Sequence, residues 1–145
     1  MNVVHMAGNS DSKSSLDAIK QLANKGSIEL KATVDLDMQS IEQDYTEKIQ
    51  VLENSRCRAT VLLTHTKVSA KLLLQVDRLN KNTRFEFVLW DNAFSVPSYL
   101  RQDPKNNIEL VNRVMHGVFV VSAFTGVGTA RFVFVECAHD TLWCN

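Results

Sequence analysis

A strand pattern, a helix pattern and a second strand pattern follow one another between Ala59 and Trp90. The apolar residues of Ala59–Thr64 and Phe85–Trp90 come as nearly continuous runs, whereas those of Lys67–Asn80 recur at helical spacing. Continuous runs are typical of strands covered on both faces, and parallel strands joined by one helix form a right-handed crossover. The stretch therefore predicts a βαβ unit inside a parallel sheet.

The residues before this unit predict two further strands and two further helices. Strands are expected over Asn2–Ala7 and over Ser27–Val34, which alternates weakly as an edge strand does. The helix between them is expected to end at Gly26. A capping-box pattern begins at Ser40 and predicts a second helix that runs to about Asn54.

The residues after the unit are less regular. Ser95–Asn107 contains both prolines and few apolar residues, which predicts an unusually long loop. Gly117–Phe124 predicts the last strand. Ala130–Trp143 suggests a final helix, but its many β-branched and aromatic residues leave a strand as the open alternative.

This order of elements predicts an α/β fold: a three-layer sandwich with a mostly parallel, doubly wound sheet and helices on both faces. At 145 residues and 45% hydrophobic, the chain is expected to form a single domain over 1–145. The expected sheet core shares the continuous apolar runs of the predicted strands. It consists of Val61, Leu62, Leu63, Phe87, Val88, Leu89, Val118 and Val120.

The composition excludes several kinds of partner. Lysine and arginine number 16, and so do aspartate and glutamate, so the net charge is zero and no nucleic-acid or anionic-membrane footprint exists. Three cysteines without C-x-x-C spacing give no zinc site, and free or buried thiols are the simplest interpretation. No apolar run reaches the roughly 18 residues of a membrane span, and no signal-peptide pattern occurs.

Nothing in the motifs predicts an enzyme or a bound cofactor. The turn after the first strand has one glycine, which is too few for a dinucleotide or P-loop fingerprint. A triad of Cys57, His65 and Asp91 can be imagined, but no spacing requires it and no nucleophile elbow is present. A histidine directly after a buried strand is more often structural than catalytic.

Ligands on parallel sheets bind beyond the carboxyl ends of the strands, which makes two places candidates. Asp91 follows a predicted strand and could hold an ammonium or hydroxyl group, or could serve the turn it stands in. Ser10, Asp11 and Ser12 open the first helix, where backbone amides could hold an anion, although capping of the helix by one of these residues is the commoner role.

The same residues resemble a family: the extracellular ligand-binding region of class C G-protein-coupled receptors, especially metabotropic glutamate receptors, within the type I periplasmic-binding-protein and natriuretic-receptor group. The similarity covers nearly the whole chain but only the second lobe of a two-lobed clamshell. It lies in the order of eight segments: Ser14–Ile19, Arg58–Thr64, Lys71–Leu74, Asp77–Asn80, Phe85–Asp91, His116–Val121, Arg131–Glu136 and Leu142–Cys144.

The resemblance implies an amino-acid-like ligand held between two lobes. The family's ligand-binding aspartate falls on Asp91 and its serine on Ser10, while the position of its tyrosine is held by Asp11. Ser12 stands where the family has a glycine. The resemblance also places a disulfide-forming cysteine at Cys144, with its partner outside this chain, and therefore implies that Cys144 reacts with thiol reagents before Cys57 does.

The resemblance further implies that the chain is a fragment, with a first lobe, a seven-helix membrane domain and a receptor dimer as partners. It would then lie on the extracellular side of the plasma membrane and signal through G proteins. The alternative is a free-standing solute-binding or regulatory α/β module. Neither interpretation involves nucleic acid, a metal or another cofactor.

Overall fold

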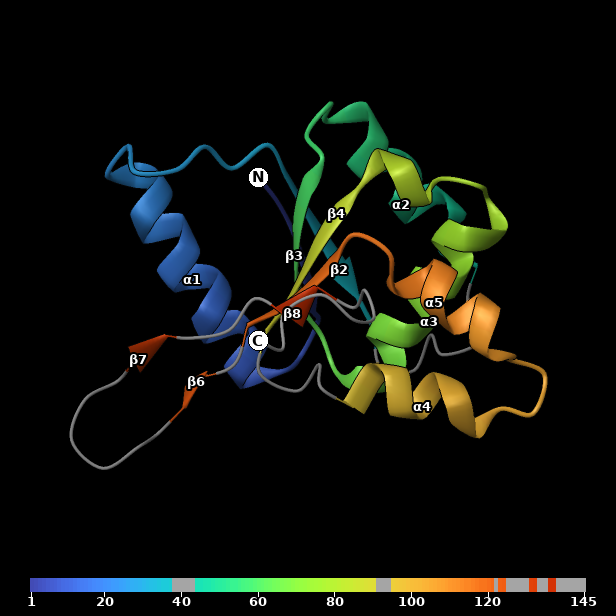
Figure 1. The fold of residues 1–145 in the computed structure, drawn as a ribbon. Coiled ribbons are helices and arrows are strands. Elements are labelled where there is room, and N and C mark those ends of the chain that lie inside the picture. The colour runs from blue at the N-terminus through green and yellow to red at the C-terminus, as the bar shows by residue number, and fades with distance from the viewer. Residues whose placement is uncertain (38–43, 91–94, 122, 125–130, 133–135, 138–145) are drawn as a thin grey trace.

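The structure is a computed structural model that describes residues 1–37, 44–90, 95–121, 123–124, 131–132 and 136–137 (Figure 1). One sheet in this part of the chain has the strand order β2-β1-β3-β4-β5-β8. The first five of these strands are parallel to their neighbours, and β8 runs antiparallel to β5. Their bounds are β1 Asn2–Met6, β2 Ala32–Leu36, β3 Ala59–Leu63, β4 Glu86–Trp90, β5 Val118–Val121 and β8 Glu136–Cys137.

Helices cover both faces of the sheet, so the predicted three-layer, doubly wound α/β fold is confirmed (Figure 1). Helix α1 lies on one face, and four described helices lie on the other side. The bounds are α1 Ser10–Asn24, α2 Thr46–Asn54, α3 Thr66–Arg78, α4 Val96–Gln102 and α5 Ile108–Met115. No helix within the described ranges has the length and apolar character that crossing a bilayer requires.

The central βαβ prediction is confirmed by the pairing of β3 with β4. The two strands are parallel, with Ala59 opposite Glu86, and α3 connects them through the short 3-10 helix η2 (Asn82–Arg84). Helix α3 turns Val68, Leu72 and Val76 toward the sheet, where all three are buried. Spacing by three and four residues puts these side chains on one face of a helix, which is why the sequence pattern was reliable here.

The two faces of the sheet are buried to different extents. Of the predicted core, six residues are buried, but Val61 and Val88 are only half-buried. Val61 and Val88 are paired across β3 and β4, so their side chains point to the same face, the one that carries α1. Because α1 packs against β1 and β3, the described residues cover Val88 incompletely.

The second strand begins later than the sequence pattern predicted. Ser27–Val34 was expected, whereas β2 covers Ala32–Leu36. Strand β2 pairs only with β1 among the described strands, and β1 itself begins at Asn2, which lies opposite Ala32. The Lys31 amide still donates to the Met1 carbonyl at 2.8 Å, but among the described strands the ladder itself can begin only at Ala32.

The predicted long loop over Ser95–Asn107 is wrong, because much of it forms helix α4. Pro97 stands in the first turn of this helix, where the missing N–H has no intrahelical partner to lose. Val96 and Leu100 are buried on one side of α4. Asn107 then caps α5, since its Oδ1 accepts a hydrogen bond of 2.8 Å from the Leu110 amide.

The C-terminal expectations need correction in the described residues. Gly117–Phe124 is not one strand but β5 followed by a separate short strand, β6 (Ala123–Phe124), paired with β7 (Arg131–Phe132). Within Ala130–Trp143, the described residues form strands β7 and β8, so the strand alternative is confirmed for these residues and the helix is not. The predicted helix start at Ser40 lies outside the described residues, and α2 is described from Thr46.

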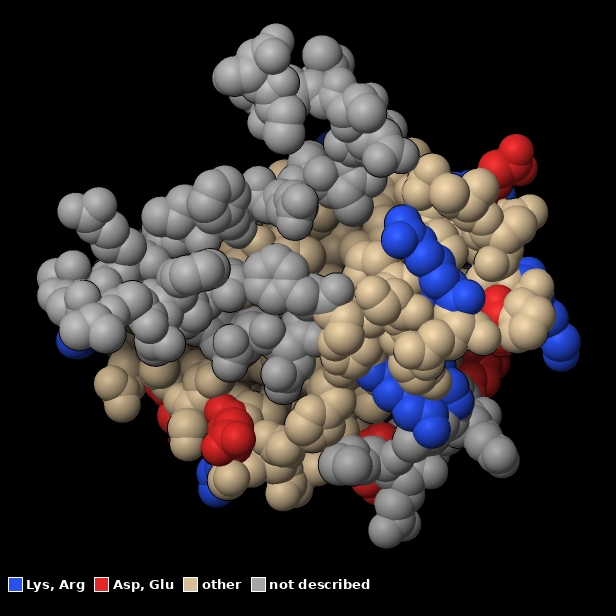
Figure 2. Space-filling model, turned by 60° about the horizontal axis from the view of Figure 1, so that its bottom comes forward, with Lys and Arg blue, Asp and Glu red and all other residues tan. Residues whose placement is uncertain are grey.

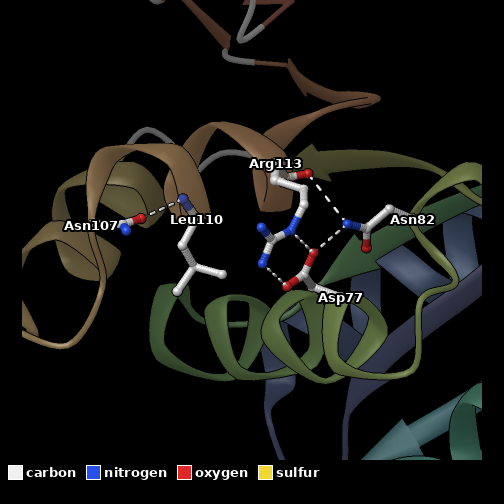
Figure 3. A network of polar contacts seen from close by, with 5 residues as sticks. All are labelled: Asp77, Asn82, Asn107, Leu110 and Arg113. Carbon is white, nitrogen blue, oxygen red and sulfur yellow. Dashed lines mark hydrogen bonds and ion pairs between the residues drawn. The ribbon is translucent and has the colours of Figure 1, made fainter.

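An ion pair joins α3 to α5 (Figure 3). Arg113 donates to both carboxylate oxygens of Asp77, through Nε at 2.7 Å and Nη2 at 2.8 Å. Asn82 Nδ2 donates a third hydrogen bond to Asp77 at 2.6 Å. Asp77 is buried, whereas the Arg113 side chain is 60% exposed.

Candidate functional site

The carboxyl ends of β1, β3 and β4 meet at one edge of the sheet because these strands are parallel. We call this the carboxyl edge; it lies at the bottom of Figure 1. Helices α1, α3 and α4 all begin just beyond it. The polar side chains that the described residues bring there are those of Asn9, Ser10, Asp11, Ser12, His65, Thr66 and Ser95.

Asn9 caps helix α1. Its Oδ1 accepts a 2.8 Å hydrogen bond from the Ser12 amide, and its backbone is extended (φ −94°, ψ 121°), as a cap requires. The prediction that Ser10, Asp11 or Ser12 supplies the cap is therefore wrong. The helix begins at Ser10, so these three residues already lie in its first turn.

The hydroxyl of Ser12 connects the ends of two strands. Its Oγ accepts from the Met6 amide at 2.8 Å and donates to the Leu63 carbonyl at 2.7 Å. The Ser12 side chain is buried beneath the turn. The geometry therefore assigns Ser12 a positioning role at the carboxyl edge, because its hydroxyl hydrogen is already donated to the protein.

Ser10 and Asp11, in contrast, are exposed in the first turn of α1. Ser10 Oγ donates a long hydrogen bond of 3.4 Å to Asp11 Oδ1. A carboxylate at this position is favoured by the dipole of α1. It also disfavours a second anion there, so the outer part of this turn suits an ammonium or hydroxyl group.

His65 joins the turn before α1 to the start of α3. Its Nε2 lies 3.3 Å from Asn9 Nδ2, and the imidazole is half-buried. An amide nitrogen only donates, so Nε2 is the acceptor of this hydrogen bond. Asn9 was not predicted as a site residue, and His65 was considered only as a member of the imagined triad. Each follows a strand of a parallel sheet, which is the signal that could have found them.

Thr66 and Ser95 extend the carboxyl edge toward α4. The two hydroxyl oxygens are 2.8 Å apart, so the first residue of α3 is tied to the residue before α4. Figure 2 views this edge and shows charges of both signs interspersed among uncharged side chains in the described part of the surface. The site is therefore polar without a single dominant charge.

The remaining sequence-predicted residues are either outside the described residues or far from this edge. Asp91 and Cys144 lie outside the described residues. Cys57 stands before β3 and His65 after it, so the strand separates them and the imagined Cys57–His65–Asp91 triad is not assembled. Among described residues, no cluster of three histidine, cysteine or acidic side chains has the arrangement of a metal site.

Comparisons of sequence give no relative. No protein-family description matches the chain, and no curated protein sequence does. Comparison of structures does give matches. An amino acid ABC transporter substrate-binding protein from Pseudomonas fluorescens Pf-5 is 19% identical with a TM-score of 0.64, and the match covers 83% of this chain and 29% of that one.

Two further solved structures give the same result. A substrate-binding periplasmic protein from Ralstonia solanacearum has a TM-score of 0.60 at 10% identity, covering 83% of this chain and 30% of its own. A type 1 periplasmic binding protein from Bordetella pertussis Tohama I has a TM-score of 0.60 at 16% identity, covering 83% and 29%.

The fold is that of a type I periplasmic-binding-protein lobe. This confirms the fold that the resemblance implies. The chain spans less than a third of the length of these three proteins. At such low identity the likeness concerns the fold alone. Any function of this chain must therefore be inferred from its own residues, above all from those at the carboxyl edge.

Proposed function

We propose that the chain is one lobe of a two-lobed binding domain and that it holds a small amino-acid-like molecule at its carboxyl edge. The observation that carries the proposal is the convergence of exposed or half-buried polar side chains where β1 and β3 end, among them Ser10, Asp11 and His65. A ligand there would meet the start of α1 and of α3 together. Binding rather than catalysis is proposed.

The chemistry of the edge favours a zwitterion. Asp11 supplies a carboxylate for an ammonium group, and the first-turn amides of α3 supply donors for a carboxylate away from Asp11. Ser10 adds a hydroxyl next to Asp11. By resemblance, Asp91 would contribute a second acceptor for the ammonium group.

In its more specific form, the proposal makes the chain the second lobe of a class C receptor ectodomain, extracellular, with a first lobe, a membrane domain and a receptor dimer as partners. Cys144 would pair outside this chain. Ligand-driven closure of the lobes would then shift the population between open and closed receptors.

A free-standing solute-binding module is the second candidate. The structural similarity to the amino acid ABC transporter substrate-binding protein from Pseudomonas fluorescens Pf-5 favours it. The reading frame on both sides of the coding sequence distinguishes the candidates. An upstream lobe and seven downstream apolar spans support the receptor, and their absence supports the module.

The binding proposal is tested by NMR titration of the ¹⁵N-labelled chain with the standard amino acids at millimolar concentration. One lobe leaves a ligand mostly in water, so we expect weak, millimolar binding with amide shifts confined to residues 9–12 and 65–66. Asp11→Asn should weaken the shifts several-fold. Asp17→Asn, an exposed carboxylate further along α1, is the matched control.

Shifts centred elsewhere, or equal titrations of Asp11→Asn and wild type, would remove the basis for this site. Micromolar affinity for one amino acid would instead overturn the half-site interpretation, because a single lobe would then suffice. In that case the free-standing module gains.

A further inference from the structure

A hollow of about 550 Å³ lies at the amino ends of β3 and β4, the edge opposite to the carboxyl edge. We call it the amino-edge hollow. Its volume falls within the range of roughly 300–1,000 Å³ that is typical of small-molecule sites. It is lined by Glu53, Arg56, Cys57, Arg58, Thr83 and Arg84.

The frame of the amino-edge hollow is held by backbone contacts. Arg56 has a left-handed backbone (φ 57°), and its amide donates to the Glu53 carbonyl at 3.0 Å. The Cys57 carbonyl accepts a hydrogen bond of 2.9 Å from the side-chain amide of the buried Asn2. The backbone amide of Glu86 donates to the Arg58 carbonyl at 3.0 Å. The segments that carry the three arginines are therefore positioned before any ligand arrives.

The charges around the amino-edge hollow are predominantly positive. Glu53 lines it, but Lys81 Nζ lies 2.6 Å from Glu53 Oε2 and compensates this carboxylate. Arg58 is 3.2 Å from Glu86 in an exposed ion pair. Among the described residues, neither Arg56 nor Arg84 has a side-chain hydrogen bond or close ion pair. The Lys81 hydrogen bond lowers the pKa of Glu53, and the charge of Arg84 adds to this effect. Both guanidinium groups can therefore still form hydrogen bonds with a ligand.

We propose that the amino-edge hollow binds a small polyanion, with two or more phosphate or carboxylate groups, through Arg56, Arg84 and Arg58. Guanidinium groups bind both kinds of oxyanion with paired hydrogen bonds, and several of them on a fixed frame favour a multiply charged ligand over a single carboxylate. In a chain of zero net charge this is a local preference. The site is separate from the proposed carboxyl-edge site and stands or falls independently of it.

The test is calorimetric titration of the whole chain with pyrophosphate in one arm and citrate in the other, at low and high salt. We expect one site per chain, weakened by salt. Arg56→Gln and Arg84→Gln should each lower the affinity about tenfold, since a hydrogen bond to a charged group contributes about that much. Arg101→Gln, an exposed arginine of α4 near the carboxyl edge, is the control of equal charge change and should bind as wild type does.

A second readout follows from Cys57, whose half-buried thiol group lines the amino-edge hollow. Bound polyanion should slow its modification by the neutral reagent N-ethylmaleimide several-fold, as followed by mass spectrometry of the peptide that contains Cys57. Equal affinity in all three arginine variants, or labelling of Cys57 at the same rate with and without ligand, would overturn the proposal. Binding in only one arm would identify the phosphate or the carboxylate class as the ligand.

Discussion

Ser12 connects the ends of β1 and β3 through one hydroxyl group, and its removal should be costly. Ser12→Ala would leave the buried Met6 amide and Leu63 carbonyl without this partner. An unsatisfied buried polar group costs about 1–3 kcal/mol, so we expect the free energy of unfolding to fall by about that amount. Urea denaturation followed by circular dichroism measures it.

Ser10→Ala is the matched control, because among the described residues the exposed Ser10 hydroxyl donates only to the neighbouring Asp11, at 3.4 Å. This variant should change the free energy of unfolding by less than about 0.5 kcal/mol. If Ser10→Ala and Ser12→Ala lose equal stability, the positioning role assigned to Ser12 is wrong.

Single residues also explain how much of the carboxyl edge could be predicted from the sequence. The position of the turn before α1 at the carboxyl ends of the strands was predictable, because it depends only on strand direction. The role of each side chain in Asn9–Ser12 was not predictable. Asn9 caps the helix and Ser12 is buried, while Ser10 and Asp11 are exposed. This arrangement depends on the contact of Ser12 with Leu63, a residue distant in sequence.

At the scale of elements, the attachment of α5 to α3 depends on Asp77 and Arg113 (Figure 3). The Arg113 hydrogen bonds, aided by the one from Asn82, hold the pKa of Asp77 below its ordinary value despite burial. The pair therefore stabilises the fold above the ordinary carboxyl pKa of about 4, and this contribution is lost as the pH falls through the lowered pKa.

Arg113→Gln should lower the free energy of unfolding at pH 7 by about 1–3 kcal/mol, because the buried Asp77 loses its principal partner. The difference from wild type should begin to shrink as the pH falls below the ordinary carboxyl pKa of about 4, and should be lost once the pH falls below the lowered pKa of Asp77 in the folded protein. Denaturation at a series of pH values measures both. Arg101→Gln should show neither effect, and a loss that is the same at pH 3 and pH 7 would contradict the assigned ion pair.

Elements were predictable where local pattern and tertiary environment agree. Helix α3 and strands β3 and β4 have continuous or helically spaced apolar residues, and all were found. Helix α4 was missed because Pro97 and few apolar residues suggested a loop, whereas burial of Val96 and Leu100 against the core stabilises a short helix there. Strand β2 was misplaced because its bounds are set by its pairing with β1, and the local sequence of β2 carries no information about that pairing.

On the scale of the whole molecule, the two proposed sites lie at opposite ends of the same parallel strands. The carboxyl edge is mixed in charge, and the amino-edge hollow is rich in arginine. Net charge and composition average over both sites, so they gave no sign of the hollow. Its arginines come from segments that only the pairing of β3 with β4 brings together.

The strand order has a kinetic consequence. Strands β1 and β2 are joined by α1, and β3 and β4 by α3, so each pair closes over a short connection, whereas the β1–β3 ladder joins Asn2 to the distant Thr60. Among β1–β5, the β1–β3 ladder is the only one that does not join consecutive strands of the chain, and we call it the seam. Contacts between residues distant in sequence form slowly. Ser12 and Asn2 each bond across the seam, at its opposite ends, and so hold its register.

We therefore expect the chain to fold as two halves that dock along this seam. In pulse-labelling hydrogen exchange during refolding, amides that donate across β3–β4 should gain protection before those that donate across β1–β3. Simultaneous protection of both ladders would mean that the halves do not form separately. The β1–β3 ladder, which is expected to form last, then lies in the interior of the finished sheet, and its carboxyl end adjoins the turn that leads into α1.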